Sequence, residues 1–199
     1  MNAARLTVIC AISTAPIASA GLAIARQSPE PIVWSARRKL DWTDFLAKPP
    51  RDLDGARSVL SYNYAAGCRD GRLQATVTAL FLPDRSWVSY RIVSSGLASR
   101  VGLRHEQTHF DMKEVYARRA RKMFAELAAP CPRSDESLLA LAERVFKDEA
   151  AAQERFEIET RDGENETRQI EWEKRVASDL AALSAYTAAP GPPADLQKE

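Results

Sequence analysis

The spacing of apolar residues changes once along this chain, and the change divides it into a β part and an α part. Upstream of residue 95, apolar and polar residues alternate or β-branched residues are frequent, which predicts three strands, at residues 58–66, 72–82 and 86–93. Because the connections between them are short, we expect an antiparallel meander. From about residue 97 the apolar residues recur at the spacing of an amphipathic helix. Strands followed by helices predict an α+β fold.

Three helices are expected after the strands, at residues 97–127, 134–160 and 166–185. A proline-rich connector separates the first two, and a break around Gly163 separates the last two. Ser134 suits the N-cap of the second helix, because its hydroxyl can accept from a backbone N–H of the first turn. A short helical turn, capped by Asp41 or Thr43 and ended by Pro49, is expected ahead of the strands.

Both ends of the chain differ in composition from the part between them. Residues 1–25 combine an early arginine, an apolar stretch and a small-x-small pattern ending at Ala20 or Ala25, which is typical of a secretory signal peptide. The apolar stretch is shorter than the roughly 20 strongly apolar residues of a permanent span, although an uncleaved anchor is the alternative. Residues 186–199 are rich in proline, which predicts a disordered tail. We therefore expect one domain, residues 30–185, that is periplasmic or secreted and is not stably inserted in a membrane once the signal is cleaved.

Charge and cysteine content narrow the possibilities further. A net charge of +1 gives no general attraction to nucleic acid, which is therefore not an expected partner. Signal cleavage would leave two cysteines, Cys68 and Cys131. In an oxidising compartment they can form one disulfide, and two unpaired thiols are the alternative.

Both histidines of the chain lie in one short stretch, HEQTH, inside the first predicted helix. Residues four apart share a helix face, so His105 and His109 can bind one zinc ion. Glu106 is rotated by about 100° from His105, which puts it beside the metal as a general base for water. The alternative is a charged helix that carries two unrelated histidines. The pattern H-E-x-x-H favours the zinc site, because it rarely arises by chance in a chain of this length and here it uses both histidines. A bound zinc would lower the pKa of its water to about 7.

A catalytic zinc takes three protein ligands, and with no third histidine the last one is expected to be a carboxylate. If the first two helices form an antiparallel hairpin, His109 faces about residue 154 and His105 faces about residue 159. The candidates on the second helix are then Glu154, Glu157 and Glu159. Glu159 is our first choice, because it continues an apolar stripe through Ala152 and Phe156, and Glu157 and Asp162 follow it. Asp111, on the histidine helix, is expected to hold an imidazole N–H instead.

These residues also resemble a known family. HEQTHFD, followed by FEIETRDG and then by Gln169 and Trp172, resembles the bacterial family called domain of unknown function 922, which is described as predicted secreted zinc-dependent proteases. The resemblance covers roughly residues 30–185 and implies a zincin-like fold and a gluzincin-like peptidase. The family pattern has a histidine before the glycine, where this chain has Asp162. The resemblance therefore implies that Asp162 replaces that histidine as a ligand or that the activity is altered.

Three functions remain as hypotheses. The first is an exported zinc metallopeptidase in which Glu106 passes a proton from water to the leaving amine of a peptide or protein substrate. In it, residues 86–93 form an edge strand that pairs with the substrate. The second is a zinc-binding envelope protein of the same fold without catalysis, which Asp162 favours. The third is a structural module whose last helix, with Trp172, binds a partner.

Overall fold

The computed structural model describes residues 28–127 and 134–187. The expected signal peptide, Cys131 and the tail beyond residue 187 lie outside these ranges. Cys68 is described and is disulfide-bonded, whereas the other two cysteines of the sequence, Cys10 and Cys131, are not described. Within the described ranges, no helix has a stretch long and apolar enough to cross a membrane.

The larger sheet is built on a long hairpin of β3 (Leu60–Arg69) and β4 (Arg72–Phe81), which pair antiparallel along their whole length. Two residues close the hairpin, Asp70 and Gly71, with φ of 52° and 70°. Positive φ at both central residues matches the right-handed twist of the strands, and aspartate followed by glycine is a favoured pair for such a turn. The short β1 (Ile32–Val33) pairs with the other edge of β4. Two of the three predicted strands are thereby confirmed.

The third predicted strand, residues 86–93, is wrong beyond Val88. Only β5 (Trp87–Val88) is a strand, and it pairs antiparallel with β2 (Ala56–Arg57) in a separate small sheet. Ser89 then caps a short helix, α1 (Tyr90–Ser94), because its hydroxyl accepts from the N–H of Ile92. This cap satisfies a backbone donor that a strand would have to pair elsewhere, and it turns the chain toward the next helix.

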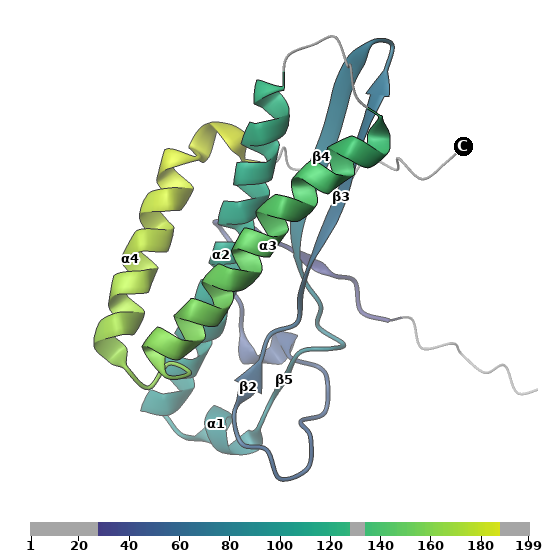
Figure 1. Ribbon diagram of the computed structural model, residues 1–199. Coiled ribbons are helices and arrows are strands. Elements are labelled where there is room, and N and C mark those ends of the chain that lie inside the picture. Colours follow the sequence, from purple (N-terminus) through teal and green to yellow (C-terminus); the bar gives the residue numbers. More distant parts are fainter. Residues whose placement is uncertain (1–27, 128–133, 188–199) are drawn as a thin grey trace, which may run out of the picture.

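The three long helices agree with the predicted ranges to within a few residues. They are α2 (Leu97–Glu126), α3 (Asp135–Thr160) and α4 (Glu166–Ala182), and the 3-10 turn η2 (Ser184–Tyr186) follows α4. Ser134 caps α3 as expected, and Asp41 caps the predicted short turn, η1 (Trp42–Asp44). Figure 1 shows α2 between the hairpin and α4, with α3 running back antiparallel to α2. Antiparallel sheets followed by α-helices agree with the expected α+β class.

Two buried apolar clusters fix the position of α2. One face of the helix packs against the hairpin through Phe110 and Phe124, which join a core with Val77 and Phe81 of β4. Another face packs against α3 and α4, in a cluster whose buried members are Met112, Val115, Tyr116, Ala152, Phe156, Trp172 and Val176. Because α2 is held on both sides, its first turns are carried to the end of the molecule where α3 ends, α4 begins and β2 and β5 lie (Figure 1).

Candidate metal centre

His105 and His109 lie one turn apart on α2, and both are buried, with 5% and 9% of their surface exposed. Their Nε2 atoms are 3.1 Å apart, so the two rings are aimed at one point, as the H-E-x-x-H spacing predicts. Phe156 of α3 packs against both rings, stacked on His105 at 4.6 Å and edge-on to His109 at 4.8 Å between centroids. The phenyl ring restricts the imidazoles on the side facing the core.

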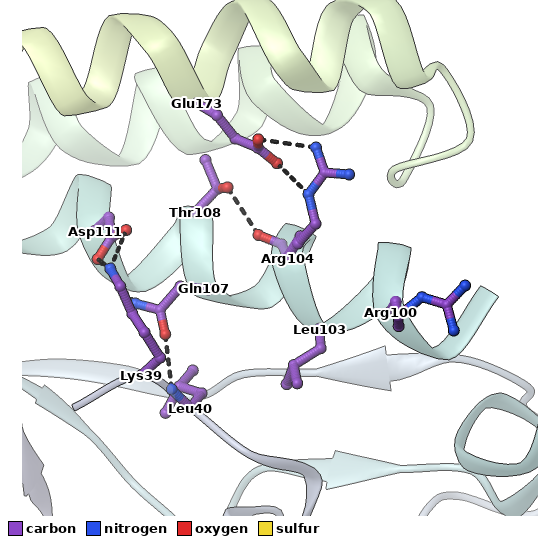
Figure 2. A pocket seen from close by; sticks show the side chains of 9 residues that line it. All are labelled: Lys39, Leu40, Arg100, Leu103, Arg104, Gln107, Thr108, Asp111 and Glu173. Atoms are coloured by element: carbon purple, nitrogen blue, oxygen red, sulfur yellow. Dashed lines mark hydrogen bonds and ion pairs between the residues drawn. The ribbon is translucent and has the colours of Figure 1, made fainter. Parts of the chain in front are cut away.

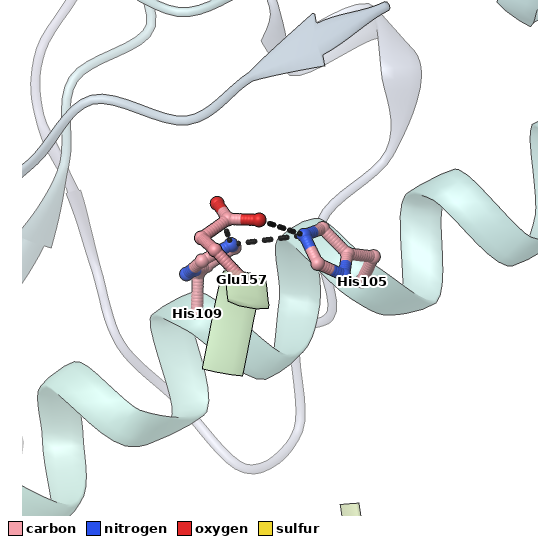
Figure 3. Close-up of side chains that lie close together, drawn as sticks. All are labelled: His105, His109 and Glu157. Carbon is pink, nitrogen blue, oxygen red and sulfur yellow. Dashed lines mark hydrogen bonds and ion pairs between the residues drawn. The ribbon is translucent and has the colours of Figure 1, made fainter. Parts of the chain in front are cut away.

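Glu157 of α3 completes the group. Its Oε1 lies 2.9 Å from Nε2 of His109 and its Oε2 lies 3.2 Å from Nε2 of His105. Figure 3 shows the three side chains pointing toward one another. One ligand atom from each of the three residues falls within 4.8 Å of the others, which is the arrangement that can hold a metal ion. Burial alone would raise the pKa of Glu157, but hydrogen bonds and charge from His105 and His109 outweigh it and lower that pKa. In the same way, burial would lower the pKa of His109, and the bond with Glu157 and the charge of Glu106 raise it instead.

Glu159, the expected third ligand, lies outside this group, and the carboxylate beside the two histidines is that of Glu157. Residues two apart on a helix are rotated by about 200°, so the two carboxylates leave α3 on opposite sides. Glu159 accepts a hydrogen bond of 2.9 Å from Nε1 of Trp172 on α4. The buried stripe of α3 passes from Phe156 to Thr160 rather than to Glu159. Glu154, also considered, is exposed.

The pairing of α2 with α3 explains why Glu157, and not Glu159, lies beside the histidines. His109 contacts Gln153 and His105 contacts Glu157, so the hairpin is one to two residues tighter than the sequence estimate had it. A shift of this size turns the facing side of a helix by 100° or more, which is enough to exchange one candidate carboxylate for another.

Glu106, the expected base, is buried and belongs to the same pocket as the group. Its Oε2 accepts a hydrogen bond of 2.8 Å from the backbone N–H of Ser58, just after β2. This bond holds the carboxylate in one orientation. Glu106, His109 and Glu157 line a pocket of about 370 Å³ together with residues of α2, α3 and the segment from β2 to the start of β3, namely Ala56, Arg57, Ser58, Leu60, Lys113, Glu149, Ala150 and Gln153.

Asp162, in the turn between α3 and α4, lies beside Glu157 but outside the group of three. Its pKa is raised, first by its contact with the Glu157 carboxyl and then by burial, while the charge of His105 opposes the shift. The turn has three successive residues with positive φ, Arg161 at 51°, Asp162 at 55° and Gly163 at 87°. Such a turn reverses the chain direction sharply, and Gly163 therefore lies next to the ring of His105.

Gly163 packs tightly against the ring of His105. A Cβ at this position would lie 3.2 Å from Nδ1 and 3.3 Å from Cγ of His105, and φ is +87°. We expect Gly163→Ala to lower the free energy of unfolding by about 1–2 kcal/mol through backbone strain. We also expect it to weaken metal binding by about tenfold, because the ring that must bind the metal is displaced. Denaturant unfolding and a metal competition titration measure the two effects.

Gly71→Ala is the matched control for that variant. Its φ is +70°, and nothing lies within 4 Å of the added Cβ, so it carries similar backbone strain without touching the site. It should lose comparable stability and bind metal as the wild type does. Equal metal binding by the Gly163→Ala and Gly71→Ala variants would show that close packing against His105 has no role.

The Nδ1 atoms of both imidazoles have partners that the sequence did not assign. Nδ1 of His105 lies 3.1 Å from Oε1 of Gln169 on α4, and Nδ1 of His109 lies 2.5 Å from Oε1 of Gln153 on α3. An amide oxygen only accepts, so each Nδ1 carries the proton and each Nε2 presents a lone pair. When both imidazoles are neutral, their two Nε2 lone pairs and the Glu157 carboxylate converge on one point, where a metal ion or a proton relieves the repulsion.

Asp111 does not hold an imidazole, contrary to expectation. It accepts from Nε1 of Trp34 at 2.7 Å and from Nε2 of Gln107 at 2.8 Å, and it forms an ion pair with Lys39. Asp111 follows His109 by two residues, which places it on the far side of α2. It ties the N-terminal segment to that helix. Gln169 belonged to the family pattern without a role, and only the packing of α4 on α2 identifies its contact.

The far side of α2 carries a larger pocket, of about 530 Å³, which contains neither histidine. Figure 2 shows its lining residues, among them Lys39, Arg104, Asp111 and Glu173. Arg104 binds the Glu173 carboxylate through Nε at 3.1 Å and through Nη2 at 2.9 Å, and Lys39 is paired with Asp111. Since these charges already neutralise one another, the pocket offers no counterpart to the convergent group around His105.

No protein-family model, no curated protein and no solved structure matches this chain in comparisons with known proteins. The resemblance to the family called domain of unknown function 922 therefore stays a prediction. What the chain does has to be argued from the geometry of the group formed by His105, His109 and Glu157 and from the pocket beside it.

Proposed function

We propose that this protein is a zinc-dependent metallopeptidase. The observation that carries the proposal is the group of two buried histidines, His105 and His109, with the half-buried Glu157, and the Glu106 carboxylate in the adjoining pocket. Two imidazoles and one carboxylate are a ligand set used by catalytic zinc sites. Ligands about 2.0–2.1 Å from a tetrahedral zinc are about 3.3–3.4 Å from one another. The two Nε2 atoms are 3.1 Å apart, and each lies near a different oxygen of Glu157, at 2.9 and 3.2 Å, so the three side chains surround a space of about that size.

His105, His109 and Glu157 would hold the zinc, which when bound lowers the pKa of water and polarises a carbonyl group. Glu106 takes the proton from the attacking water and then gives it to the leaving amine of the substrate. The Ser58 N–H keeps that carboxylate facing the pocket during both transfers. Burial of Glu106, 5% exposed, protects the proton from exchange with bulk water.

The sequence suggested that the substrate pairs with residues 86–93. In the structure, β2 is the better placed strand, and we expect the substrate to lie along it. β2 is an edge strand of its sheet, with β5 on one side, and both of its residues, Ala56 and Arg57, line the pocket. An extended peptide that pairs with the other edge of β2 would place its carbonyl groups beside Glu106 and Glu157. Ser58, which follows β2, already binds Glu106, so the strand and the base are held in register.

Export is part of the proposal. Cys68 is disulfide-bonded, and structural disulfides persist mainly in oxidising compartments such as the periplasm or the extracellular space. Together with the predicted signal peptide, this supports a periplasmic or secreted peptidase.

A zinc-binding envelope protein without catalysis is the second candidate, and Asp162 is the observation that favours it. Asp162 lies beside Glu157 where the family pattern has a histidine. A carboxyl group there offers no positive charge to a transition state that becomes more negative. Both candidates bind zinc at the same three residues, so activity has to separate them.

Removal of the metal tests the proposed function. We expect the mature protein to contain zinc, to cleave casein or members of a peptide library, to lose that cleavage with a chelator and to regain it when zinc is returned. The physical reason is that the water attacks efficiently near neutral pH only with a metal ion present. Elemental analysis and mass spectrometry of the products provide the measurements. Bound zinc without any cleavage would favour the second candidate, and absence of zinc would exclude both.

A further inference from the structure

Gln169 of α4 is fully buried, and its amide orientation is fixed by its neighbours. Nε2 donates to Oγ1 of Thr108 at 3.1 Å and to Oε1 of Glu173 at 2.9 Å. The Thr108 hydroxyl gives its own hydrogen to the carbonyl of Arg104, so it accepts from Gln169. A carboxylate also only accepts. The carbonyl end of Gln169 must therefore face Nδ1 of His105.

Gln153 of α3 is fixed in the same way at the second imidazole. Its Nε2 donates to the backbone carbonyl of His109 at 3.1 Å and to Oε1 of Glu149 at 2.7 Å. Both partners are acceptors only, so a flipped amide would bring oxygen against oxygen at two contacts. The carbonyl end of Gln153 therefore faces Nδ1 of His109.

The carboxylate that accepts from each glutamine amide is itself part of an ion pair. Glu173 binds Arg104, as Figure 2 shows, and Glu149 binds Nζ of Lys113 at 3.0 Å. Lys113 also lies over the ring of Tyr62, 4.1 Å from its centroid. Two similar chains of contacts thus run from cation to carboxylate to amide to imidazole, one through α4 and one through α3.

We propose that Gln153 and Gln169 are positioning residues that preset both imidazoles for the metal. Each amide oxygen accepts from Nδ1–H, which selects the tautomer with a free Nε2 and fixes the direction of the ring before an ion arrives. α4 thereby contributes to the metal centre although it supplies none of the three candidate ligands, because Gln169 lies on it. This inference rests on the proposed metal site and extends it to the residues behind the ligands.

Substitution by leucine removes the acceptor at similar volume. We expect Gln169→Leu and Gln153→Leu each to weaken zinc binding by about 10–100-fold in a competition titration with a chromophoric chelator. Gln107→Leu is the matched control. Gln107 lies on α2, the helix of both histidines, and its amide accepts from the N–H of Leu40 and donates to Asp111, but its described bonds do not involve an imidazole. It should bind zinc as the wild type does, even where it lowers the melting temperature.

Substitution by glutamate separates positioning from packing. Gln169→Glu and Gln153→Glu keep an oxygen acceptor for Nδ1–H but lose the amide donor and place a second carboxylate next to Glu173 or Glu149. We expect these variants to be less stable than the wild type and yet to recover at least tenfold of the zinc affinity that the leucine variants lose. A purely structural role would make zinc affinity follow stability in all four variants.

Imidazole NMR gives a direct reading, since the chain has only the two histidines. In the untagged, zinc-loaded wild type we expect two Nδ1–H signals with slow solvent exchange, and the leucine variants should each lose the protection of one. Wild-type zinc affinity together with unchanged Nδ1–H signals in both leucine variants would overturn the inference. Because no cleavage is measured, this result is independent of whether the protein is a peptidase.

Discussion

Glu106→Gln is expected to reduce peptide cleavage by about 10²–10⁴-fold while zinc content stays at the wild-type level. Glutamine has the shape of glutamate and can accept the same hydrogen bond from the Ser58 N–H through its amide oxygen. It cannot take up a proton from water at neutral pH. The substitution therefore removes the base and leaves the pocket, the three candidate ligands and the fold in place. Initial rates on one peptide substrate, with zinc measured in the same samples, give the result.

Glu154→Gln is the control for that experiment, because it makes the same chemical change at an exposed position of α3. Its rate should equal that of the wild type. Equal cleavage by Glu106→Gln and Glu154→Gln would exclude Glu106 as the base, and with it the proposed mechanism. A loss of zinc from the Glu106→Gln variant would instead mean that this carboxylate supports the metal, and the rate could not then be read as catalysis.

The part of the site that could be predicted is the part that one helix contains. His105, Glu106 and His109 lie within five consecutive residues, so the geometry of an α-helix alone places them relative to one another. Their burial also follows from the apolar residues that share their faces, such as Phe110 and Met112. The local fold was predictable for the same reason, since helix periods, the Ser134 cap and the Asp70–Gly71 turn are all local signals.

What could not be predicted depends on how two helices meet. Glu157 and Glu159 differ by two positions, and only the exact pairing of α3 with α2 decides which of them reaches the histidines. A sequence fixes the length of a connection but not the tilt and offset at which side chains of facing helices interlock. The contacts of Gln153 and Gln169 could not be predicted for a related reason, because glutamine gives no chemical sign of a metal site unless its partner is known.

The same limit applies to residues 86–93. Alternating apolar residues suit a strand. This segment does not pair with the larger sheet, however, and only two of its residues pair with β2. The Ser89 hydroxyl donates to Asp54, which lies outside the segment, and accepts from the N–H of Ile92 as the cap of α1. Neither interaction can be read from the alternation of apolar residues. Tertiary contacts override a strand preference in such a case.

Glu157→Gln is expected to weaken zinc binding by more than roughly 100-fold. Loss of a residue that only hydrogen-bonds a metal ligand costs up to about 100-fold, and loss of a ligand should cost more. The carboxylate contacts Nε2 of both histidines, at 2.9 and 3.2 Å, and supplies the negative charge among the three candidate ligands. A glutamine keeps the size of the side chain but offers a neutral, weaker oxygen ligand. Competition with a chelator of known affinity measures the loss, and casein cleavage should fall with zinc occupancy.

Glu159→Gln makes the same change two residues away and serves as the matched control. Its carboxylate accepts a hydrogen bond from Nε1 of Trp172, and an amide oxygen can accept the same bond. We therefore expect a loss of stability of about 1 kcal/mol or less and unchanged zinc affinity.

Asp162→Asn, beside Glu157, tests whether the neighbouring carboxyl also binds the metal. It should leave zinc affinity within a few-fold of the wild type, because Asp162 is outside the group of three. If Glu159→Gln or Asp162→Asn lost zinc more severely than Glu157→Gln, the assignment of Glu157 as the third ligand would be wrong. The Glu157 and Glu159 side chains leave α3 about 200° apart, so the two variants cannot exchange roles through a small adjustment of the helix.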